Sequence, residues 1–370
     1  MDKQESKKKI CITGGHLSPA VAVIEEIKAR KKPWDIVFVG RAKTSHLNAN
    51  QSEEKSMVEK MGIPFIAIHA GRFSRFFSLH SFFELFLIPV GFIESFVFCL
   101  REKPDCIVSF GGYVGLPVVK AGWLLGIPTI IHEQTHVLGL ANKIASEFAD
   151  KIVLTFPDAR MQKDTRVSVV GLPLRAAFLH PPKKISFPIP ADKPILYVTG
   201  GTTGAASMND LIFPIIHSFV HTYTVIHQTG QKSYAKALTV LDTISKEEKN
   251  SYIPMEYIES GDVAWILRHA HLVIGRSGAN TVAEVAAVRK PAVFIPLPWG
   301  SHQEQRRNAT WYASIGGDVT IVDQPKTSSE QLEKIIVEAL QSQGKTSEVT
   351  RDEGTVTATA AIVQSIASLM

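Results

Sequence analysis

The sequence predicts an α/β protein with two doubly wound domains, because three patterns agree. Short apolar runs of strand length alternate with longer stretches of helical character, which is typical of parallel sheets covered by helices. This alternation stops in a proline-rich stretch near residue 180 and then starts again. Glycines follow several of the apolar runs, as they do at turns that lead from a strand into a helix.

Each apolar run is interpreted as a buried parallel strand. The runs in the first domain are Lys9–Thr13, Ile36–Gly40, Phe65–His69, Cys106–Phe110, Thr129–His132, Ile152–Thr155 and Val167–Val170. Those in the second domain are Ile195–Thr199, Thr224–His227, Leu272–Ile274 and Ala292–Ile295.

The order of these runs gives a domain organisation. Residues 1–178 form the first domain, and residues 195–345 form the second. The stretch 179–194 has many prolines and no periodicity, and is interpreted as a linker. The segment 346–370 has apolar residues at near-helical spacing, so we expect a final helix that returns to the first domain.

Composition excludes several classes of protein. The chain has 370 residues, of which 45% are hydrophobic and 20% charged, and this is enough for two globular cores. A net charge of +5 is too small for a dedicated nucleic-acid binder, but it is compatible with an anionic membrane surface or a phosphorylated ligand. The three cysteines, Cys11, Cys99 and Cys106, have neither zinc-site nor disulfide spacing, so a reducing compartment and no metal are expected.

The segment Phe73–Leu100 is rich in phenylalanine, but Glu84, Pro89 and Glu94 interrupt it. A spanning helix needs about 20 nearly uninterrupted apolar residues. We therefore expect this segment to lie at a membrane surface or in the core. For the first alternative, the docking residues would be Arg72, Phe73, Arg75, Phe76 and Phe77.

The first motif that indicates chemistry is Thr13-Gly14-Gly15-His16, where a strand ends in a glycine turn before a helix. Backbone N–H groups at such a turn, and the positive end of the helix, favour an anion. The alternative is a purely structural turn with a structural histidine.

A second glycine turn, Gly111-Gly112-Tyr113, again follows a strand, and the next strand ends in His132-Glu133-Gln134-Thr135. Burying four such polar side chains without partners is costly, so a ligand site is favoured over a core position. A hydrogen-bonded loop clamp is the alternative.

The second domain opens with a third turn, Thr199–Ala205. It lacks the lysine of a P-loop and the spacing of a dinucleotide fingerprint, which argues against ATP hydrolysis and NAD. Its backbone amides and hydroxyls suit a diphosphate.

The fourth motif is Arg276–Glu284, followed by Pro296 and by Ser301–Ala309. Its small residues allow close approach of a ligand to a helix start, and the Glu284 carboxylate can accept both hydroxyls of a ribose.

Taken in order, these motifs resemble the MurG family of glycosyltransferases, over about residues 9–312. The matching segments are TGGH, GGYV, HEQT, GLPLR, GGTTGA, HQTG, RSGANTVAE and QEQRRNA. The resemblance implies a GT-B fold, in which two Rossmann-like domains face a cleft. It also implies inverting, metal-independent transfer of N-acetylglucosamine from UDP-GlcNAc, without a cofactor, to undecaprenyl-diphospho-muramoyl-pentapeptide (lipid I to lipid II). Such an enzyme is peripheral at the cytoplasmic face of the cell membrane and serves peptidoglycan biosynthesis.

The resemblance also implies roles for individual residues, with His16 as the general base. The donor would be bound by Arg175, Thr202, Ile258, Ser277, Gly278, Ala279, Thr281, Glu284, Gln305 and Asn308. The polyprenyl-diphosphate-linked acceptor would be bound by Thr13, Gly14, Gly15, Gly111, Gly112, Tyr113, Glu133, Gln134 and Thr135.

The sequence departs from the family pattern at several of these motifs. Cys11 and Ile12 stand where the usual GGTGGH turn has its first two glycines, and Thr135 and Leu172 each replace an asparagine. In the third turn, Thr202-Thr203 replaces Ser-Gln. These changes bear on the identity of the acceptor and donor sugar more than on the fold.

Three other functions stay open at this point. A related glycosyltransferase with another lipid-linked acceptor would share the donor motifs. A sugar-nucleotide epimerase could use the same double scaffold, since fold does not fix reaction. A catalytically silent sugar-nucleotide-binding protein is the third alternative, although His16 and Glu284 are retained.

Overall fold

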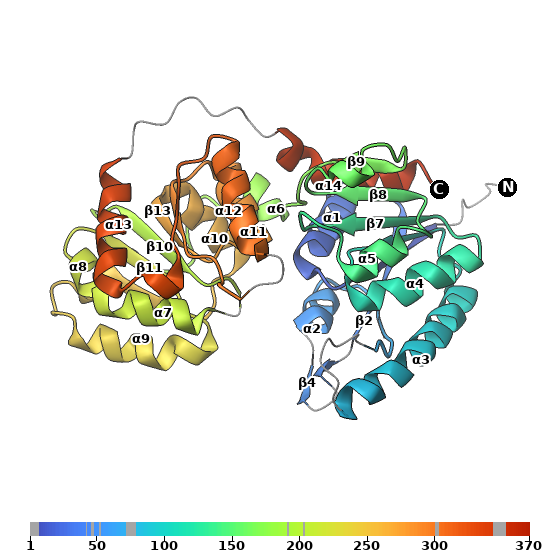
Figure 1. Ribbon diagram of the computed structural model, residues 1–370, viewed down its shortest axis with the longest axis horizontal. Coiled ribbons are helices and arrows are strands. Elements are labelled where there is room, and N and C mark those ends of the chain that lie inside the picture. Colours follow the sequence, from blue (N-terminus) through green and yellow to red (C-terminus); the bar gives the residue numbers. More distant parts are fainter. Residues whose placement is uncertain are drawn as a thin grey trace. The chain divides into compact units, whose positions relative to one another are not determined.

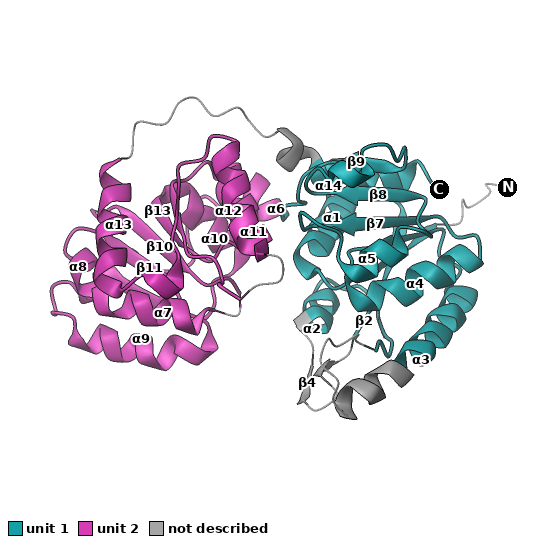
Figure 2. Ribbon diagram, in the orientation of Figure 1, with its two compact units in different colours: residues 1–175, 354–370 teal, residues 176–353 magenta. Residues whose placement is uncertain are grey.

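The structure is a computed structural model, which describes residues 7–41, 43–45, 48–51, 53–71, 79–190, 192–202, 204–299, 303–342 and 353–370. The chain divides into two compact units (Figure 2). The first consists of Met1–Arg175 together with Gly354–Met370, and the second is Ala176–Glu353.

In its described residues, the first unit contains a parallel sheet of seven strands in the order β5-β2-β1-β6-β7-β8-β9 (Figure 1). Every strand predicted in this region is present, with small differences at the ends. The strands are β1 (Lys8–Thr13), β2 (Trp34–Gly40), β5 (Phe65–Ala67), β6 (Cys106–Ser109), β7 (Thr129–Glu133), β8 (Lys151–Leu154) and β9 (Val167–Val169).

Helices lie on both faces of this sheet. They are α1 (Leu17–Ala29), α2 (Glu53–Lys60), α3 (Leu79–Glu102), α4 (Gly112–Leu124), α5 (Leu140–Ala145) and α14 (Glu353–Ala367). A short antiparallel hairpin of β3 (Lys43–Ser45) and β4 (Asn48–Gln51) was not predicted.

The buried strands explain why helices cover two faces. Successive side chains of a strand point to opposite faces. Ile10 and Ile12 of β1 accordingly pack in one apolar cluster, whereas Cys11 packs in another. The last helix, α14, contributes Ile362 and Ile366 to the cluster of Ile10, so the end of the chain belongs to the first unit.

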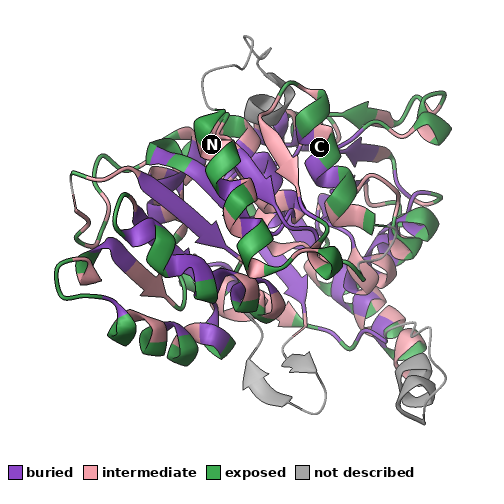
Figure 3. Cartoon of the chain, turned by 60° about the vertical axis from the view of Figure 1, so that its left-hand side comes forward, coloured by how far each residue is buried: buried purple, intermediate pink, exposed green. Residues whose placement is uncertain are grey.

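The second unit repeats the architecture with six strands in the order β12-β11-β10-β13-β14-β15. They are β10 (Ile195–Thr199), β11 (Thr224–Gln228), β12 (Tyr252–Met255), β13 (Ala270–Gly275), β14 (Ala292–Phe294) and β15 (Val319–Ile321). The edge strands β12 and β15 were not predicted. As Figure 3 shows, the central strands are buried and the outward faces of the helices are exposed.

The helices of the second unit are α6 (Ala176–Leu179), α7 (Ala206–Ile212), α8 (Ile216–Val220), α9 (Gln231–Thr243), α10 (Ser260–His269), α11 (Ala279–Val288), α12 (Glu304–Ser314) and α13 (Ser329–Gln341). The proline-rich stretch leads into this unit and is tied to it. Phe178 is buried, and the backbone N–H of Ser186 donates to Asp262 Oδ1 over 2.9 Å.

The phenylalanine-rich segment forms much of α3, and Pro89 lies within that helix. No helix among the described residues is long and apolar enough to cross a membrane. Phe98 is buried against the sheet, but Val90, Ile93, Val97 and Leu100 are exposed. The five predicted docking residues at 72–77 lie outside the described residues.

Candidate active site

Two glycine turns interlock where β1 and β6 end. The backbone N–H of Gly15 donates to the carbonyl of Gly111 over 2.8 Å, and that of Phe110 donates to the carbonyl of Thr13 over 2.7 Å. Gly14 has φ +147°, and a Cβ there would lie 2.7–2.8 Å from backbone atoms of Phe110. This approach requires glycine. It brings the first turns of α1 and α4 to the same end of the sheet, and helix N-termini favour anions.

Buried polar atoms at this end of the sheet have no hydrogen-bond partner within the described residues. They include Thr13 Oγ1, Ser109 Oγ, His132 Nδ1 and Gln134 Oε1. Thr13 and Ser109 are at most 1% exposed. Unpaired buried polar groups are costly in native proteins, so their accumulation here indicates a site for a polar ligand.

His16 lies at the N-terminus of α1, and two opposing influences act on its imidazole. Burial lowers the pKa of His16, and the nearby Glu133 carboxylate opposes this; the net pKa lies below the ordinary value of 6.5. His16 is therefore neutral at neutral pH. A neutral imidazole can accept a proton, which is the property that a general base needs.

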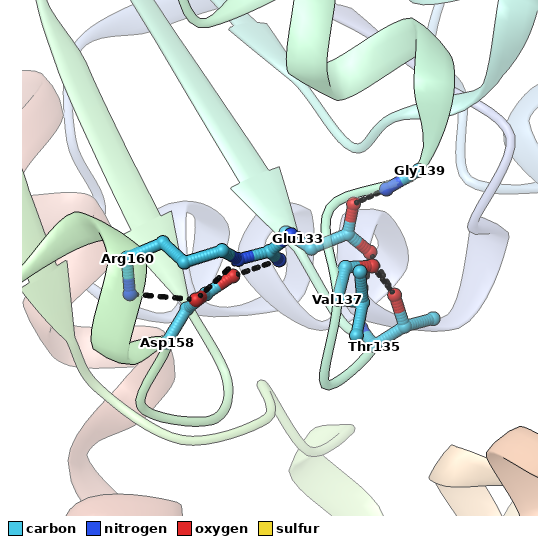
Figure 4. A network of polar contacts seen from close by, with 6 residues as sticks. All are labelled: Glu133, Thr135, Val137, Gly139, Asp158 and Arg160. Carbon is cyan, nitrogen blue, oxygen red and sulfur yellow. Dashed lines mark hydrogen bonds and ion pairs between the residues drawn. The ribbon is translucent and has the colours of Figure 1, made fainter. Parts of the chain in front are cut away.

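Glu133, at the end of β7, is buried and accepts hydrogen bonds at both of its oxygens (Figure 4). Its Oε1 lies 3.0 Å from the backbone nitrogen and 2.8 Å from the hydroxyl of Thr135. Its Oε2 accepts from the Gly139 N–H and from Asn142 Nδ2, each over 3.0 Å. These bonds fix the carboxylate and attach the start of α5 to the end of β7.

His132 precedes Glu133 on β7 and is fully buried. Burial and, second, the proximity of His16 lower the pKa of His132 to about 3. Its Nε2 lies 3.2 Å from the hydroxyl of Thr155. His132 is therefore a neutral structural neighbour of the site.

Three other predicted acceptor residues, Gly112, Tyr113 and Thr135, line a cavity of about 660 Å³ within the first unit. Tyr113 contributes to its wall, and the guanidinium of Arg41 lies 5.0 Å from the Tyr113 ring centroid. Thus the first unit brings together the predicted acceptor set at the carboxyl end of its sheet, with His16, Gly112, Glu133 and Thr135 lining the cavity itself.

In the second unit, three of the predicted donor residues, Ser277, Gly278 and Ala279, lie at the start of α11. Gly278 precedes the first residue of the helix in extended backbone, and Ser277 and Ala279 are buried beside it. Arg276 holds this segment, because its guanidinium donates to the Ile295 carbonyl over 2.8 Å and to Ser207 Oγ over 2.9 Å.

Asn308 and Gln305 extend from α12 toward the same segment. Asn308 is fully buried, and its Nδ2 donates to the Ser277 carbonyl over 3.0 Å; its Oδ1 has no partner among the described residues. Gln305 Oε1 accepts from the Leu297 N–H over 2.9 Å. Asn308 therefore holds the backbone before α11, and Gln305 holds the backbone that follows β14.

The other donor candidates have different surroundings. Thr281 and Glu284 are half-buried on α11; burial and, to a smaller extent, the Glu284 charge raise the pKa of the Tyr197 phenol. Ile258 is 2% exposed, whereas Thr202 is exposed on the third glycine turn.

Arg175 differs from the other donor candidates because it belongs to the first unit. Its Nε lies 3.8 Å from the Glu25 carboxylate.

Sequence reasoning missed two residues of these sites. Asn142 bridges the His132 carbonyl and Glu133, but it lies on a separate short helix, α5. Arg276 is part of a predicted motif, yet it received no role. A buried arginine directly after an apolar strand is a signal that could have identified it.

The described residues contain no group of three or more His, Cys, Asp or Glu side chains that could hold a metal ion. Cys11, Cys99 and Cys106 are buried free thiols, and burial raises the pKa of Cys99 and of Cys106 to about 12.

Comparison with known proteins identifies both halves of the chain. Residues 11–154 match the glycosyltransferase family 28 N-terminal domain, and residues 195–365 match the C-terminal domain of that family. Two solved structures share the fold with a TM-score of 0.67 each. They are MurG of Acinetobacter baumannii (24% identity, covering 96% of this chain and 99% of that one) and a UDP-GlcNAc 2-epimerase of Neisseria meningitidis bound to UDP-GlcNAc (11%, covering 98% and 100%). The predicted GT-B fold is thereby confirmed.

Two relatives in sequence are named UDP-N-acetylglucosamine–N-acetylmuramyl-(pentapeptide) pyrophosphoryl-undecaprenol N-acetylglucosamine transferases. That of Bacillus cereus is 33% identical over 319 residues, which cover 84% of this chain and 85% of the relative. That of Treponema denticola is 34% identical over 315 residues, covering 82% and 80%. The chain therefore belongs to glycosyltransferase family 28 and, within it, to the MurG family of these N-acetylglucosamine transferases.

Proposed function

We propose that this enzyme transfers N-acetylglucosamine from UDP-GlcNAc to the sugar hydroxyl of a muramoyl-pentapeptide pyrophosphoryl-undecaprenol acceptor. The observation that carries the proposal is the neutral His16 beside the fixed Glu133 carboxylate, at the end of the sheet where two glycine turns interlock. Relatives that are named for this reaction support the choice of donor and acceptor.

His16 is the proposed general base of an inverting transfer. Its neutral imidazole takes the proton of the acceptor hydroxyl as the hydroxyl oxygen forms a bond to C1 of the donor sugar. The bond between C1 and the UDP oxygen breaks on the opposite face, and UDP leaves with the electron pair. As the imidazole becomes positive, the Glu133 charge stabilises it, because opposite charges attract strongly in a buried site.

The acceptor diphosphate is proposed to bind at the interlocked glycine turns. Gly15 and Gly112 pack closely against each other there, since a Cβ on Gly112 would lie 2.9 Å from Gly15 Cα, and the N-termini of α1 and α4 supply partial positive charge. The unpaired hydroxyls of Thr13 and Ser109 are at the same end of the sheet and could donate to phosphate oxygens.

The donor is proposed to bind at the start of α11. Its diphosphate would interact with the helix N-terminus at Gly278, with Thr202 as a further candidate, and Glu284 would accept the ribose hydroxyls. Ile258 would line the uracil pocket. Gln305 and Asn308 would contact the sugar, in addition to holding the backbone at Leu297 and Ser277, respectively.

A lipid-linked acceptor requires the enzyme to work at the membrane, so we place it peripherally at the inner face of the cytoplasmic membrane. Val90, Ile93, Val97 and Leu100 of α3 follow helical spacing and are 37–61% exposed. One exposed apolar face of this kind, on a chain with a net charge of +5, suits an anionic bilayer surface.

The reaction products test this proposal against the epimerase alternative, which shares the fold. The enzyme is incubated with UDP-GlcNAc and a short-chain muramoyl-pentapeptide diphosphate acceptor, and the products are analysed by mass spectrometry and NMR. We expect UDP and a β-linked disaccharide on the acceptor. Formation of the 2-epimer of UDP-GlcNAc without sugar transfer would refute the proposal.

A further inference from the structure

The cavity that contains His16 is much larger than a diphosphate requires, and its far side is apolar. It measures about 660 Å³, within the size range of pockets that enclose a drug-sized ligand. His16, Glu133 and Thr135 line it near the ends of β1 and β7, whereas Ile88, Phe92, Leu116, Leu140 and Ile144 line it from α3, α4 and α5. The cavity is therefore amphiphilic, and its polar end coincides with the proposed reaction site.

Three helices form the apolar part, and local contacts hold α3 and α5 in place. The close approach of α3 to the chain at His69 requires Gly91, since a Cβ there would lie 1.9 Å from the His69 carbonyl oxygen. This approach brings Ala70 into the wall opposite α4. The start of α5 is held by the bonds from Gly139 and Asn142 to Glu133. The groove is thus a built feature of the first unit.

Two apolar residues that line the groove are exposed. Leu140 is 63% exposed and Ile144 is 42% exposed, although both line the cavity. Leaving such side chains in water is unfavourable, and exposed apolar patches of this kind mark binding surfaces. Of the described residues that line the groove, Lys120 alone has a cationic side chain, and its Nζ lies 5.7 Å from the Phe92 ring centroid.

We propose that this groove between α3, α4 and α5 binds the first isoprene units of the lipid acceptor, next to its diphosphate. The inference rests on the proposed function and adds a hydrocarbon subsite to it. An amphiphilic substrate presents a sugar diphosphate followed directly by a branched hydrocarbon chain. The described lining residues offer both kinds of surface: His16 and Glu133 at the proposed reaction site, the Lys120 cation, and the apolar side chains of α3, α4 and α5.

A chain-length series on the wild-type enzyme tests the subsite without any variant. Muramoyl-pentapeptide diphosphates with a methyl group or one, two, three or four isoprene units are used in solution, without detergent or vesicles and below their micelle concentrations. Burying one hydrocarbon carbon improves binding about fourfold at 25 °C. Because the groove is partly open, we expect the acceptor KM to fall at least about tenfold over the first two units. It should then stay constant, since further units extend beyond the groove.

Variants of two exposed residues that line the groove test whether the dependence of the acceptor KM on chain length arises there. The double variant Leu140→Gln with Ile144→Gln keeps the backbone of α5 but makes the groove polar. It should lose most of the chain-length gain in KM, while the KM for UDP-GlcNAc and the kcat on the methyl acceptor stay near wild-type values. Val169→Gln is the matched control, because Val169 is also an exposed apolar residue of the first unit, at 50%, but does not line the groove.

The outcomes separate the inference from the proposed function. An acceptor KM independent of chain length, or a double variant that retains the full gain, overturns the isoprene subsite while sugar transfer stands. A gain that continues to rise with every added unit also overturns it, because that behaviour reflects partition of the chain rather than a groove of fixed size. Absence of transfer to all the acceptors overturns the proposed function, and the subsite with it.

Discussion

Replacing Glu133 with glutamine removes one negative charge and leaves one backbone N–H group without its hydrogen-bond acceptor. Each carboxylate oxygen faces two donor groups: Thr135 N–H and hydroxyl on one side, Gly139 N–H and Asn142 Nδ2 on the other. A glutamine amide must turn its NH₂ toward one pair. The Thr135 side is less costly, because that hydroxyl can donate to the Val137 carbonyl, 2.7 Å away, and accept from the amide.

The loss of folding stability in Glu133→Gln follows from the hydrogen bonds that change. The Thr135 N–H then faces another donor in a buried place, at a cost of about 1–3 kcal/mol. The bonds from Gly139 and Asn142 remain but lose their charge-assisted character, about 1 kcal/mol each. The sum is about 3–5 kcal/mol, which corresponds to about 6–20 °C in the Tm of a domain of this size.

The same substitution should slow catalysis, because Glu133 no longer stabilises the His16 imidazolium as it forms. General-base assistance is worth about 10²–10⁴-fold, so we expect kcat to fall at least about tenfold at a temperature where the variant is folded. Calorimetry measures Tm, and sugar transfer to a short-chain acceptor measures kcat. Glu26→Gln is the control, since it removes only a surface ion pair with Arg30, worth about 0.3–0.5 kcal/mol. Wild-type Tm and kcat in Glu133→Gln would refute the reasoning.

Four further outcomes are expected. Glu284→Ala should weaken UDP binding about 10- to 150-fold by calorimetric titration, equivalent to about 1.5–3 kcal/mol for a charged hydrogen bond. Because the pKa of His16 is lowered below 6.5, kcat should hold from mildly alkaline pH down to 6.5 and fall as the pH drops through the lowered pKa. Gly14→Ala should abolish transfer and lower Tm well beyond Gly62→Ala, because Gly62 also has a positive φ, +71°, but has open space around its Cβ position. Ile93→Ser should lower sedimentation with anionic liposomes without changing Tm, since the side chain is 61% exposed.

Each of these expectations has a contradicting result. Unchanged UDP affinity in a folded Glu284→Ala variant removes this carboxylate from the donor site. An acid limb of the kcat profile above pH 6.5 contradicts the neutral state of His16. Equal Tm values for the two glycine variants would contradict the close backbone packing at Gly14. Undiminished liposome binding by Ile93→Ser would show that the exposed face of α3 does not contact the membrane.

The fold was predictable because its signals are local. The central strands are continuous apolar runs, and glycine turns mark their carboxyl ends, so the strand ends that carry His16, Glu133 and Ser277 could be identified. The edge strands β12 and β15 are short and only partly buried, and Pro254 lies in one of them. Such segments take their conformation from the neighbouring strand, which a local pattern cannot reveal.

The rest of the site depends on contacts between residues far apart in sequence. The bond from Asn142 to Glu133 forms only after α5 returns to the end of β7. The contact of Ser186 with Asp262, 76 residues further along the chain, draws the proline-rich stretch to the second unit, although its composition alone suggests a free linker. The apolar groove likewise needs three helices to pack together, so a pattern along one segment could not show it.

One measurement tests the central claim most directly: the transfer of radiolabel from UDP-GlcNAc into an undecaprenyl-linked muramoyl-pentapeptide, by the wild-type enzyme and by His16→Ala. The wild-type enzyme should move the label into the lipid phase. His16→Ala should lose about 10²-fold or more in kcat while its Tm and its affinity for UDP stay close to wild-type values. A His16→Ala variant that transfers label at the wild-type rate would contradict His16 as the base, and a wild-type enzyme that leaves all label in the aqueous phase would contradict the reaction itself.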